Sequence, residues 1–188
     1  MKNAAIVGLG WWGKVWVEAI QGRSGRVRFT KGVTKEPELI RDFAARHDLP
    51  IVTDYQEVLD DKSIDIVVLA TPHTLHLDQI TRAAAAGKQV FTEKPLSLTR
   101  ADGEKAIAAC EKAGVKIAIG HNRRWWPPMM EIKRMVDAGE LGTLMHVEGN
   151  FSHDILSDVG GSWRDKVEEA PAGGMTGMGI HLTDSFIN

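Results

Sequence analysis

The sequence predicts an α/β fold in which a doubly wound parallel sheet is followed by an incomplete α+β domain. Short apolar runs alternate with amphipathic stretches over residues 1–121, which is the pattern of repeated βαβ units. A glycine-rich turn at residues 8–13 directly follows the first apolar run. After residue 121 this alternation stops. We therefore expect a first domain over residues 1–121 and the start of a second over residues 122–188.

In the first domain, apolar runs predict strands and the stretches between them predict helices. The strands are expected at residues 4–7, 27–33, 64–70, 89–92 and 116–119. The helices are expected at residues 13–20, 38–46, 76–86 and 100–113. Pro37 suits the first position of its helix, and Gly87 and Gly114 stand where helices commonly end. The run 64–70 is the most strand-like and should be central.

The second region predicts fewer elements. Residues 122–128 read as a connector, residues 129–138 as a helix closed by residues 139–142, and residues 144–151 as a strand. A glycine-rich stretch and part of a helix follow. One strand alone cannot form a stable sheet. The pattern therefore predicts either a fragment of a longer natural protein or strand pairing between molecules.

Composition excludes several classes of function. Basic residues number 23 and acidic residues 25, for a net charge of −2, which gives no footprint for nucleic acid or an anionic membrane. Cys110 is the only cysteine, so neither a disulfide framework nor a cysteine metal cluster is available. No secretory signal or membrane-spanning run is evident. We expect a cytoplasmic protein without a metal site.

The turn Gly8-Leu9-Gly10-Trp11-Trp12-Gly13 is a complete G-x-G-x-x-G motif between a predicted strand and a predicted helix. In a Rossmann-type domain the first glycine permits the tight turn, the second lets a pyrophosphate approach, and the third allows close helix packing. The alternative is a merely tight strand-to-helix turn. The position of the motif between a strand and a helix favours dinucleotide binding by Gly8, Gly10 and Gly13. Trp11 and Trp12 either pack against the protein or border the cofactor.

A second motif, Thr92-Glu93-Lys94-Pro95-Leu96, lies at the end of a predicted strand. Ligands of open α/β sheets bind beyond the carboxyl ends of the strands, so Lys94 should point toward the cleft. A partly desolvated lysine stabilises the alkoxide character that develops on a substrate hydroxyl as hydride leaves. The alternative is a solvated lysine before a turn proline.

Five segments in this order resemble the Gfo/Idh/MocA oxidoreductases, the family of glucose–fructose oxidoreductase and inositol 2-dehydrogenase. They are GLGWWG at residues 8–13, LATPHTLH at 69–76, AGKQVFTEKPLSLT at 86–99, NRRWWPP at 122–128 and GMGIHLTD at 177–184. The resemblance implies hydride transfer between a nicotinamide cofactor and a hydroxyl carbon of a sugar or polyol. It also implies a longer protein, completed by an open-faced sheet domain, that forms homo-oligomers.

The resemblance assigns roles to individual residues. Lys94 contacts the substrate hydroxyl, and His181 exchanges its proton, a task that suits the pKa of histidine. Asp184, one helical turn on, orients either the imidazole or a substrate hydroxyl. The resemblance also implies a cis peptide before Pro95. The remaining expected cofactor contacts come from the loops around these positions, namely Thr71, Pro72, His76, Glu93, Lys94, Pro95 and Arg123.

One position departs from the family pattern. Four residues before the histidine the family usually has an aspartate, where this chain has Gly177. Two functions therefore stay open, an active dehydrogenase and a dinucleotide-binding sensor without turnover. The spacing of His73 and His76 also suggests a metal pair, but no cysteine or carboxylate pattern completes a site.

The choice of dinucleotide depends on the residue after the second strand. NAD-preferring domains place a carboxylate there, about 20 residues past the glycine loop, to bind the ribose hydroxyls. Here Thr34 and Lys35 occupy the position, and a hydroxyl and an ammonium suit the 2′-phosphate of NADP. NADP is thus favoured over NAD. In the competing interpretation Glu36 reaches back to the ribose, although Pro37 fixes the chain just after it.

Overall fold

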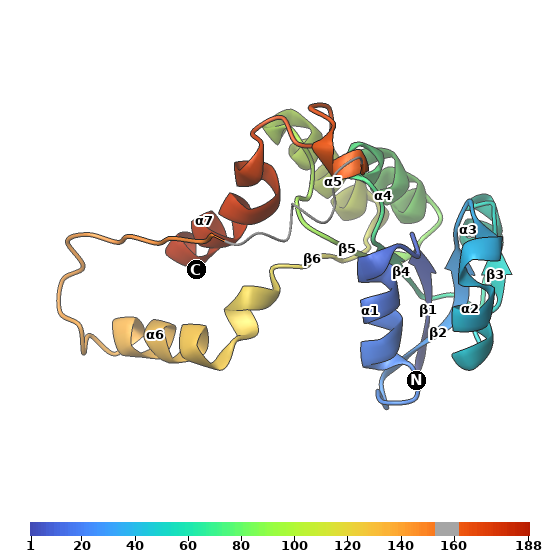
Figure 1. Ribbon diagram of the computed structural model, residues 1–188, viewed down its shortest axis with the longest axis horizontal. Helices are drawn as coiled ribbons and strands as arrows, with labels where there is room; N and C mark the ends of the chain where they lie inside the picture. Colours follow the sequence, from blue (N-terminus) through green and yellow to red (C-terminus); the bar gives the residue numbers. More distant parts are fainter. Residues whose placement is uncertain (153–161) are drawn as a thin grey trace. The chain divides into compact units, whose positions relative to one another are not determined.

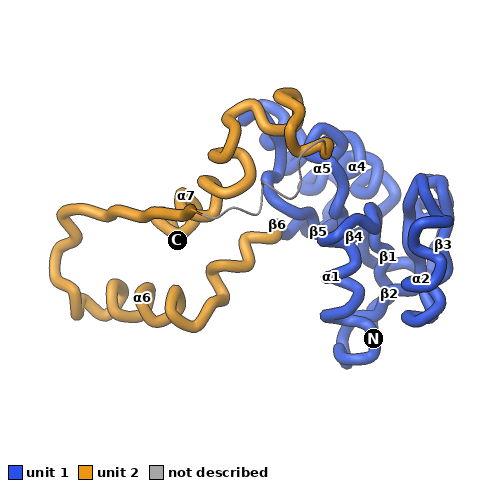
Figure 2. The backbone as a smooth tube through the Cα atoms, in the orientation of Figure 1, with its two compact units in different colours: residues 1–119 blue, residues 120–188 orange. Residues whose placement is uncertain are grey.

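A computed structural model describes residues 1–152 and 162–188 of the chain. The chain divides into two compact units, residues 1–119 and residues 120–188 (Figure 2). The first unit is built on one parallel sheet, and the described part of the second consists of helices and extended segments. Each unit is treated separately below.

All strands of the first unit run parallel in the order β3-β2-β1-β4-β5-β6 (Figure 1). Their bounds are β1 Lys2–Val7, β2 Val27–Val33, β3 Ile51–Val52, β4 Ile66–Leu69, β5 Gln89–Thr92 and β6 Ile117–Ile119. The predicted doubly wound sheet is confirmed, with β1 and β4 at its centre. Only the two-residue β3 was not expected, because so short a strand leaves no alternating pattern in the sequence.

The helices of the first unit follow the strands in alternation. They are α1 Trp11–Ile20, α2 Arg41–Arg46, α3 Gln56–Asp60, α4 His76–Ala85 and α5 Arg100–Ala113. The expected helix 38–46 begins as a 3₁₀ turn, Pro37–Ile40, with the proline in its first turn. Thr99 caps α5 by accepting a hydrogen bond from the Asp102 N–H, and Gly114 ends it at φ +67°. The short helix α3 was not expected from the sequence.

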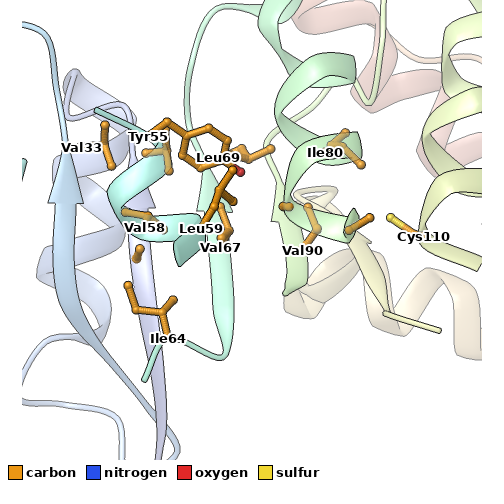
Figure 3. Close-up of a cluster of buried hydrophobic side chains, with 14 of the residues drawn as sticks. Val33, Tyr55, Val58, Leu59, Ile64, Val67, Leu69, Ile80, Val90 and Cys110 are labelled. Carbon is orange, nitrogen blue, oxygen red and sulfur yellow. The ribbon is translucent and has the colours of Figure 1, made fainter. Parts of the chain in front are cut away.

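Two apolar cores cover the two faces of this sheet. Alternate residues of β1 point to opposite faces, so Ala5 and Val7 join one core while Ala4 and Ile6 join the other. The first core contains residues of α3, α4 and α5, including Val58, Ile80 and Cys110 (Figure 3). Its other members shown there are Val33, Tyr55, Leu59, Ile64, Val67, Leu69 and Val90. The second core is closed by α1 and α2. With both faces covered, the chemistry of this unit is left to the strand ends.

The order of the strands creates a switch point between β1 and β4, because the connections leave these two strands toward opposite edges of the sheet. Ligands of open α/β folds bind at such a point, beyond the carboxyl ends of the strands. The loop after β1 begins at Gly8, the loop after β4 contains Thr71, and the loop after β5 contains Lys94. The fold therefore gathers three segments with predicted site residues at one edge.

The second unit contains two longer helices within its described residues, α6 Pro127–Asp137 and α7 Ile180–Ile187. Short 3₁₀ turns occur at Asn122–Trp125 and Trp163–Asp165, and a π-helical turn, Met175–Gly179, leads into α7. The expected helix 129–138 is thus present and begins two residues earlier. No helix that the structure describes has the length and apolar character needed to cross a bilayer.

The predicted strand at residues 144–151 is wrong. These residues are described and belong to no strand, and residues 144–150 are exposed. A strand requires a partner for its backbone N–H and C=O groups. The apolar residues Met145 and Val147, two positions apart, fit the period of a strand, but none of the described residues pairs with this segment.

Candidate dinucleotide and catalytic site

The turn after β1 requires glycine at two positions because backbone segments approach each other there. Gly8 has φ +91°, and its N–H donates to the carbonyl oxygen of Val33 at 3.0 Å. A Cβ on Gly8 would lie 2.6 Å from the carbonyl oxygen of Ala70, and one on Gly13 would collide with the carbonyl oxygen of Gly8. A Cβ on Gly10, in contrast, would meet no atom within 4 Å in the part of the chain that the structure describes. Gly8 and Gly13 thus serve the fold, while Gly10 leaves an open backbone surface.

Helix α1 begins directly at this open surface. Its N-cap is Gly10, and no described side chain caps it. The first N–H groups of a helix carry partial positive charge and suit a phosphate group. Trp11 is 62% exposed, and its ring lies 4.7 Å from that of Trp12. The arrangement fits a pyrophosphate at residues 10–13 with indole rings at its border.

The loop after β4 is fixed from inside the unit. Thr71 donates from Oγ1 to Oε1 of Gln79 at 2.6 Å. His76 is completely buried at the start of α4, with Nδ1 2.8 Å from the Pro95 carbonyl oxygen and Nε2 3.2 Å from that of Thr71. Pro72 opens the short 3₁₀ turn His73–Leu75. The sequence assigned Thr71, Pro72 and His76 to one cofactor-binding segment, and the structure places the His76 ring inside the protein beneath it.

The loop after β5 presents Lys94 between two fixed neighbours. The Lys94–Pro95 peptide is cis, as the resemblance implied. Glu93 is 9% exposed and accepts a hydrogen bond of 2.8 Å from Nε1 of Trp16 on α1. The second oxygen of Glu93 accepts from the Lys94 N–H at 3.3 Å. Glu93 therefore anchors the loop to the helix that begins at the glycine turn. Sequence reasoning missed Trp16, because its partner lies 77 residues away.

The end of β2 carries the residues that bear on the choice of dinucleotide. Thr34 is half-buried, and its N–H donates to the Val52 carbonyl oxygen at 3.2 Å. The Thr34 hydroxyl oxygen accepts from the N–H of Glu36 at 3.3 Å. Lys35 is exposed beside it. A carboxylate is absent at the first position after the strand, and a hydroxyl and an ammonium stand at this corner of the sheet edge.

In the second unit, Asp184 on α7 forms an ion pair with Arg124 and lies near His121. Nε and Nη2 of Arg124 donate to the two carboxylate oxygens at 2.9 and 2.5 Å. Nδ1 of His121 lies 3.6 Å from Oδ2. Burial of the carboxyl opposes its ionisation, but the hydrogen bond from Arg124 and the charges of His121, Arg124 and His181 outweigh burial and lower the pKa of Asp184 below 3.8. Asp184 is therefore a carboxylate.

His181 is 9% exposed, one helical turn before Asp184. The sequence gave Asp184 the role of orienting the imidazole or a substrate hydroxyl, and the structure assigns Arg124 as the partner of its carboxylate. His121 and Arg124 were outside the predicted set. About 60 residues separate them from Asp184, so no local spacing signals the contact.

Two further predicted positions lie in the second unit. The Arg123 guanidinium carbon lies 3.8 Å from the ring centroid of Phe151 and 4.7 Å from that of Trp126. Its aromatic contacts are therefore known, while a contact with a cofactor stays a prediction. Gly177 lies in the π-helical turn before α7, where a Cβ would meet no atom of the described residues within 4 Å. The described residues therefore leave space for the Cβ of an aspartate at this position.

The chain resembles known proteins over both units. Residues 2–121 match an oxidoreductase family with an NAD-binding Rossmann fold, and residues 129–187 match the GFO/IDH/MocA C-terminal domain. The scyllo-inositol 2-dehydrogenase (NADP⁺) IolW of Bacillus subtilis is 28% identical over 187 residues, which is 99% of this chain and 51% of that protein. The scyllo-inositol 2-dehydrogenase (NAD⁺) of the same organism is 41% identical over 101 residues, 54% of this chain and 29% of that protein.

A solved structure, the aldose–aldose oxidoreductase of Caulobacter crescentus complexed with glycerol, is 30% identical with a TM-score of 0.85. The match covers 98% of this chain and 56% of that one. The chain therefore spans about half the length, or less, of these three relatives. The matched half contains the sheet, the loops at its carboxyl edge and the helix that carries His181.

Proposed function

This chain belongs to the Gfo/Idh/MocA oxidoreductase family, and we propose that it serves the transfer of a hydride between a nicotinamide cofactor and a hydroxyl carbon of a sugar or polyol. The observation that carries the proposal is the arrangement at the switch point of the sheet. The open turn at Gly10 and the anchored loop that presents Lys94 both leave the carboxyl edge of one sheet. The backbone at the start of α1 would hold the phosphates of a dinucleotide bound at that edge, and Lys94 would serve the substrate beside it.

The residues of the first unit fit such a cofactor. The backbone at Gly10 and the uncapped start of α1 hold the pyrophosphate, and the loop of Thr71 and Pro72 borders the dinucleotide. The nicotinamide, when bound, supplies the hydride acceptor or donor. Thr34 and Lys35 favour the 2′-phosphate of NADP, because they offer a hydroxyl and a positive charge where NAD-preferring domains have a carboxylate.

In the proposed chemistry, one side chain acts on the oxygen of the substrate hydroxyl and another on its proton. Lys94 donates a hydrogen bond to the substrate oxygen and stabilises its alkoxide character. His181 accepts the hydroxyl proton in oxidation and returns it in reduction, while the hydrogen on carbon leaves with its electron pair. Asp184, held ionised by Arg124, keeps a negative charge one helical turn from this imidazole.

Sugars and polyols are proposed as the substrate class because the named relatives act on inositols and aldoses. A second candidate function, dinucleotide binding without turnover, is favoured by one observation. Gly177 supplies no carboxylate where the family usually has one. The two functions differ only in the chemical step, so a binding experiment must precede a turnover experiment.

The test uses two glycine variants that differ in position. Gly10→Ala and Gly25→Ala both add a methyl group where nothing lies within 4 Å, so both should fold. Gly10→Ala should weaken NADP⁺ binding at least tenfold, because its methyl group lies where the pyrophosphate approaches, and Gly25→Ala should not. Isothermal titration calorimetry measures the NADP⁺ affinity of both variants. Equal binding by the two variants would contradict the proposed site, and reduced-nicotinamide absorbance with a panel of polyols then separates turnover from binding alone.

A further inference from the structure

His76 is a fully buried polar side chain that the proposed chemistry does not use. It begins α4, and its ring lies between the loop after β4 and the loop after β5. A buried imidazole without hydrogen bonds would destabilise the fold, so its partners indicate what it does there.

Both ring nitrogens face backbone carbonyl oxygens. Nδ1 lies 2.8 Å from the oxygen of Pro95, and Nε2 lies 3.2 Å from that of Thr71. Carbonyl oxygens only accept, so the ring must donate. A neutral imidazole has one N–H, and the shorter contact favours Nδ1 as its position, whereas an imidazolium donates to both.

The two carbonyl groups belong to the segments that matter for the proposed function. Pro95 follows Lys94 directly, and Thr71 lies in the loop that borders the cofactor site. The loop of Thr71 in turn approaches the glycine turn, since a Cβ on Gly8 would lie 2.6 Å from the Ala70 carbonyl oxygen. A contact at His76 therefore reaches both the lysine and the phosphate-binding turn.

The lysine loop is held on its other side by Trp16. The indole N–H of Trp16 donates to Glu93, and Trp16 belongs to α1, which starts at the glycine turn. The contacts therefore form a closed circuit from the glycine turn through Thr71, His76 and Pro95 to Glu93 and back along α1. Such a circuit allows little independent movement of Lys94.

We propose that His76 is a positioning residue, whose buried imidazole joins the Pro95 and Thr71 carbonyl groups and so fixes the Lys94 loop against the cofactor loop. This inference rests on the proposed function, since it gives the fixed loop its purpose. It replaces the expectation that His76 contacts the dinucleotide directly. The ring acts through the backbone of its neighbours and needs no contact with a ligand.

Three variants test the role of His76. His76→Leu removes both hydrogen bonds and places an apolar side chain of similar volume at this position. His76→Gln retains an N–H donor. Tyr55→Phe is the matched control, because the Tyr55 hydroxyl donates to the Gln79 carbonyl of the same helix at 3.0 Å without touching either loop. Hydrogen exchange of the Lys94 and Leu96 amides is measured in each.

We expect exchange at Lys94 and Leu96 to rise about tenfold in His76→Leu, to recover in part in His76→Gln and to stay unchanged in Tyr55→Phe. Unchanged exchange in His76→Leu, or an equal rise in Tyr55→Phe, would overturn the proposal. In the unmodified protein, ring ¹⁵N shifts offer a test that needs no folded variant. A protonated Nδ1 supports the proposal, and a non-protonated Nδ1 overturns it.

NADP⁺ titration of the same proteins separates this inference from the proposed function. If the unmodified protein binds NADP⁺, His76→Leu should bind it several-fold more weakly than Tyr55→Phe, because the Thr71 loop loses a support. Failure of the unmodified protein to bind any dinucleotide would refute the proposed function, whereas the exchange data would still decide whether His76 fixes the loop.

Discussion

The Arg124 guanidinium holds the Asp184 carboxylate through three hydrogen bonds, Nε to Oδ2 at 2.9 Å and to Oδ1 at 3.1 Å, and Nη2 to Oδ1 at 2.5 Å. The pair joins the 3₁₀ turn Asn122–Trp125 to α7, which also carries His181. Asp184 is 5% exposed, so its charge depends on this partner. The pair therefore both fastens α7 and sets the charge beside the proposed catalytic histidine.

Replacing Arg124 with Gln should destabilise α7, because Asp184 would keep a buried charge without its main partner. Removing one partner of a fully buried pair costs more, but Arg124 is itself partly exposed, so we expect a loss of about 1–2 kcal/mol. Hydrogen exchange of the α7 amides measures the loss. The control Arg134→Gln breaks exposed ion pairs with Glu131 and Glu140 and should leave α7 unaffected. Equal protection of α7 in both variants would contradict the structural role of the pair.

The ion pair also predicts how stability depends on pH. The folded state lowers the pKa of Asp184 below its ordinary value of 3.8, so the stabilisation is complete above pH 3.8 and is lost as the pH falls through the lower, folded value. Asp184→Asn should therefore be less stable than the unmodified protein at neutral pH, and the difference should shrink in acid. The exchange of α7 amides, measured from neutral pH downward, follows it. A stability difference that grows as the pH falls would contradict this prediction.

Asp137→Asn serves as the control for this pH profile. Asp137 ends α6 and pairs with Lys133 at an exposed site. Its replacement removes one carboxylate without touching α7. A profile that changes in the same way in both variants would show that net charge, rather than the Arg124 pair, governs the acid response.

The sequence predicted the sheet well because its central strands, β1 and β4, are covered on both faces and contain short apolar runs. It missed β3, which has two residues, and it predicted a strand at residues 144–151 from the local sequence alone. Local patterns report the periodicity of a segment but not whether a partner strand exists. That information lies elsewhere in the chain or outside it.

The candidate site divides in the same way. The glycine turn and the loop of Lys94 carry local motifs, so the sequence indicated them directly. Arg124 and Trp16 act through partners 60 and 77 residues away, and no spacing rule connects such pairs. His76 was indicated by its motif, but its burial and its two carbonyl partners follow only from the packing of α4.

Lys94→Ala should lower turnover far more than cofactor affinity. The ammonium group interacts with the substrate oxygen most strongly when that oxygen gains negative charge, so we expect kcat to fall about 10²–10³-fold. The dissociation constant of NADP⁺ should change by less than about threefold. Steady-state kinetics and calorimetry measure the two quantities. Lys116→Ala, an exposed lysine before β6, controls for the loss of one charge. A large loss of NADP⁺ affinity without a fall in kcat would remove Lys94 from the chemical step.

Lys35→Ala should weaken NADP⁺ binding about tenfold and leave NAD⁺ binding unchanged, because only NADP⁺ has the 2′-phosphate that an ammonium attracts. The competing interpretation, in which Glu36 binds the ribose hydroxyls, predicts instead that Glu36→Gln weakens NAD⁺ binding. Both cofactors are titrated at matched ionic strength. Lys62→Ala is the control, since this exposed lysine precedes β4 at the opposite edge of the sheet. Tighter binding of NAD⁺ than NADP⁺ by the unmodified protein would refute the assignment.

Gly177→Asp restores the carboxylate that the family usually places four residues before the histidine. The substitution is sterically permitted at its first atom, since a Cβ there meets nothing within 4 Å, and α7 should keep its protection in hydrogen exchange. An added negative charge near His181 stabilises the imidazolium, which forms as the imidazole takes the substrate proton. If the missing carboxylate limits the chemistry, kcat for polyol oxidation should rise about tenfold or more, with NADP⁺ affinity unchanged. Gly174→Asp, whose Cβ lies 3.7 Å from Met178 outside the motif, is the control. Activity that is already high and falls in Gly177→Asp would show that glycine belongs to the working site, while binding without turnover in both proteins would favour a dinucleotide-binding function.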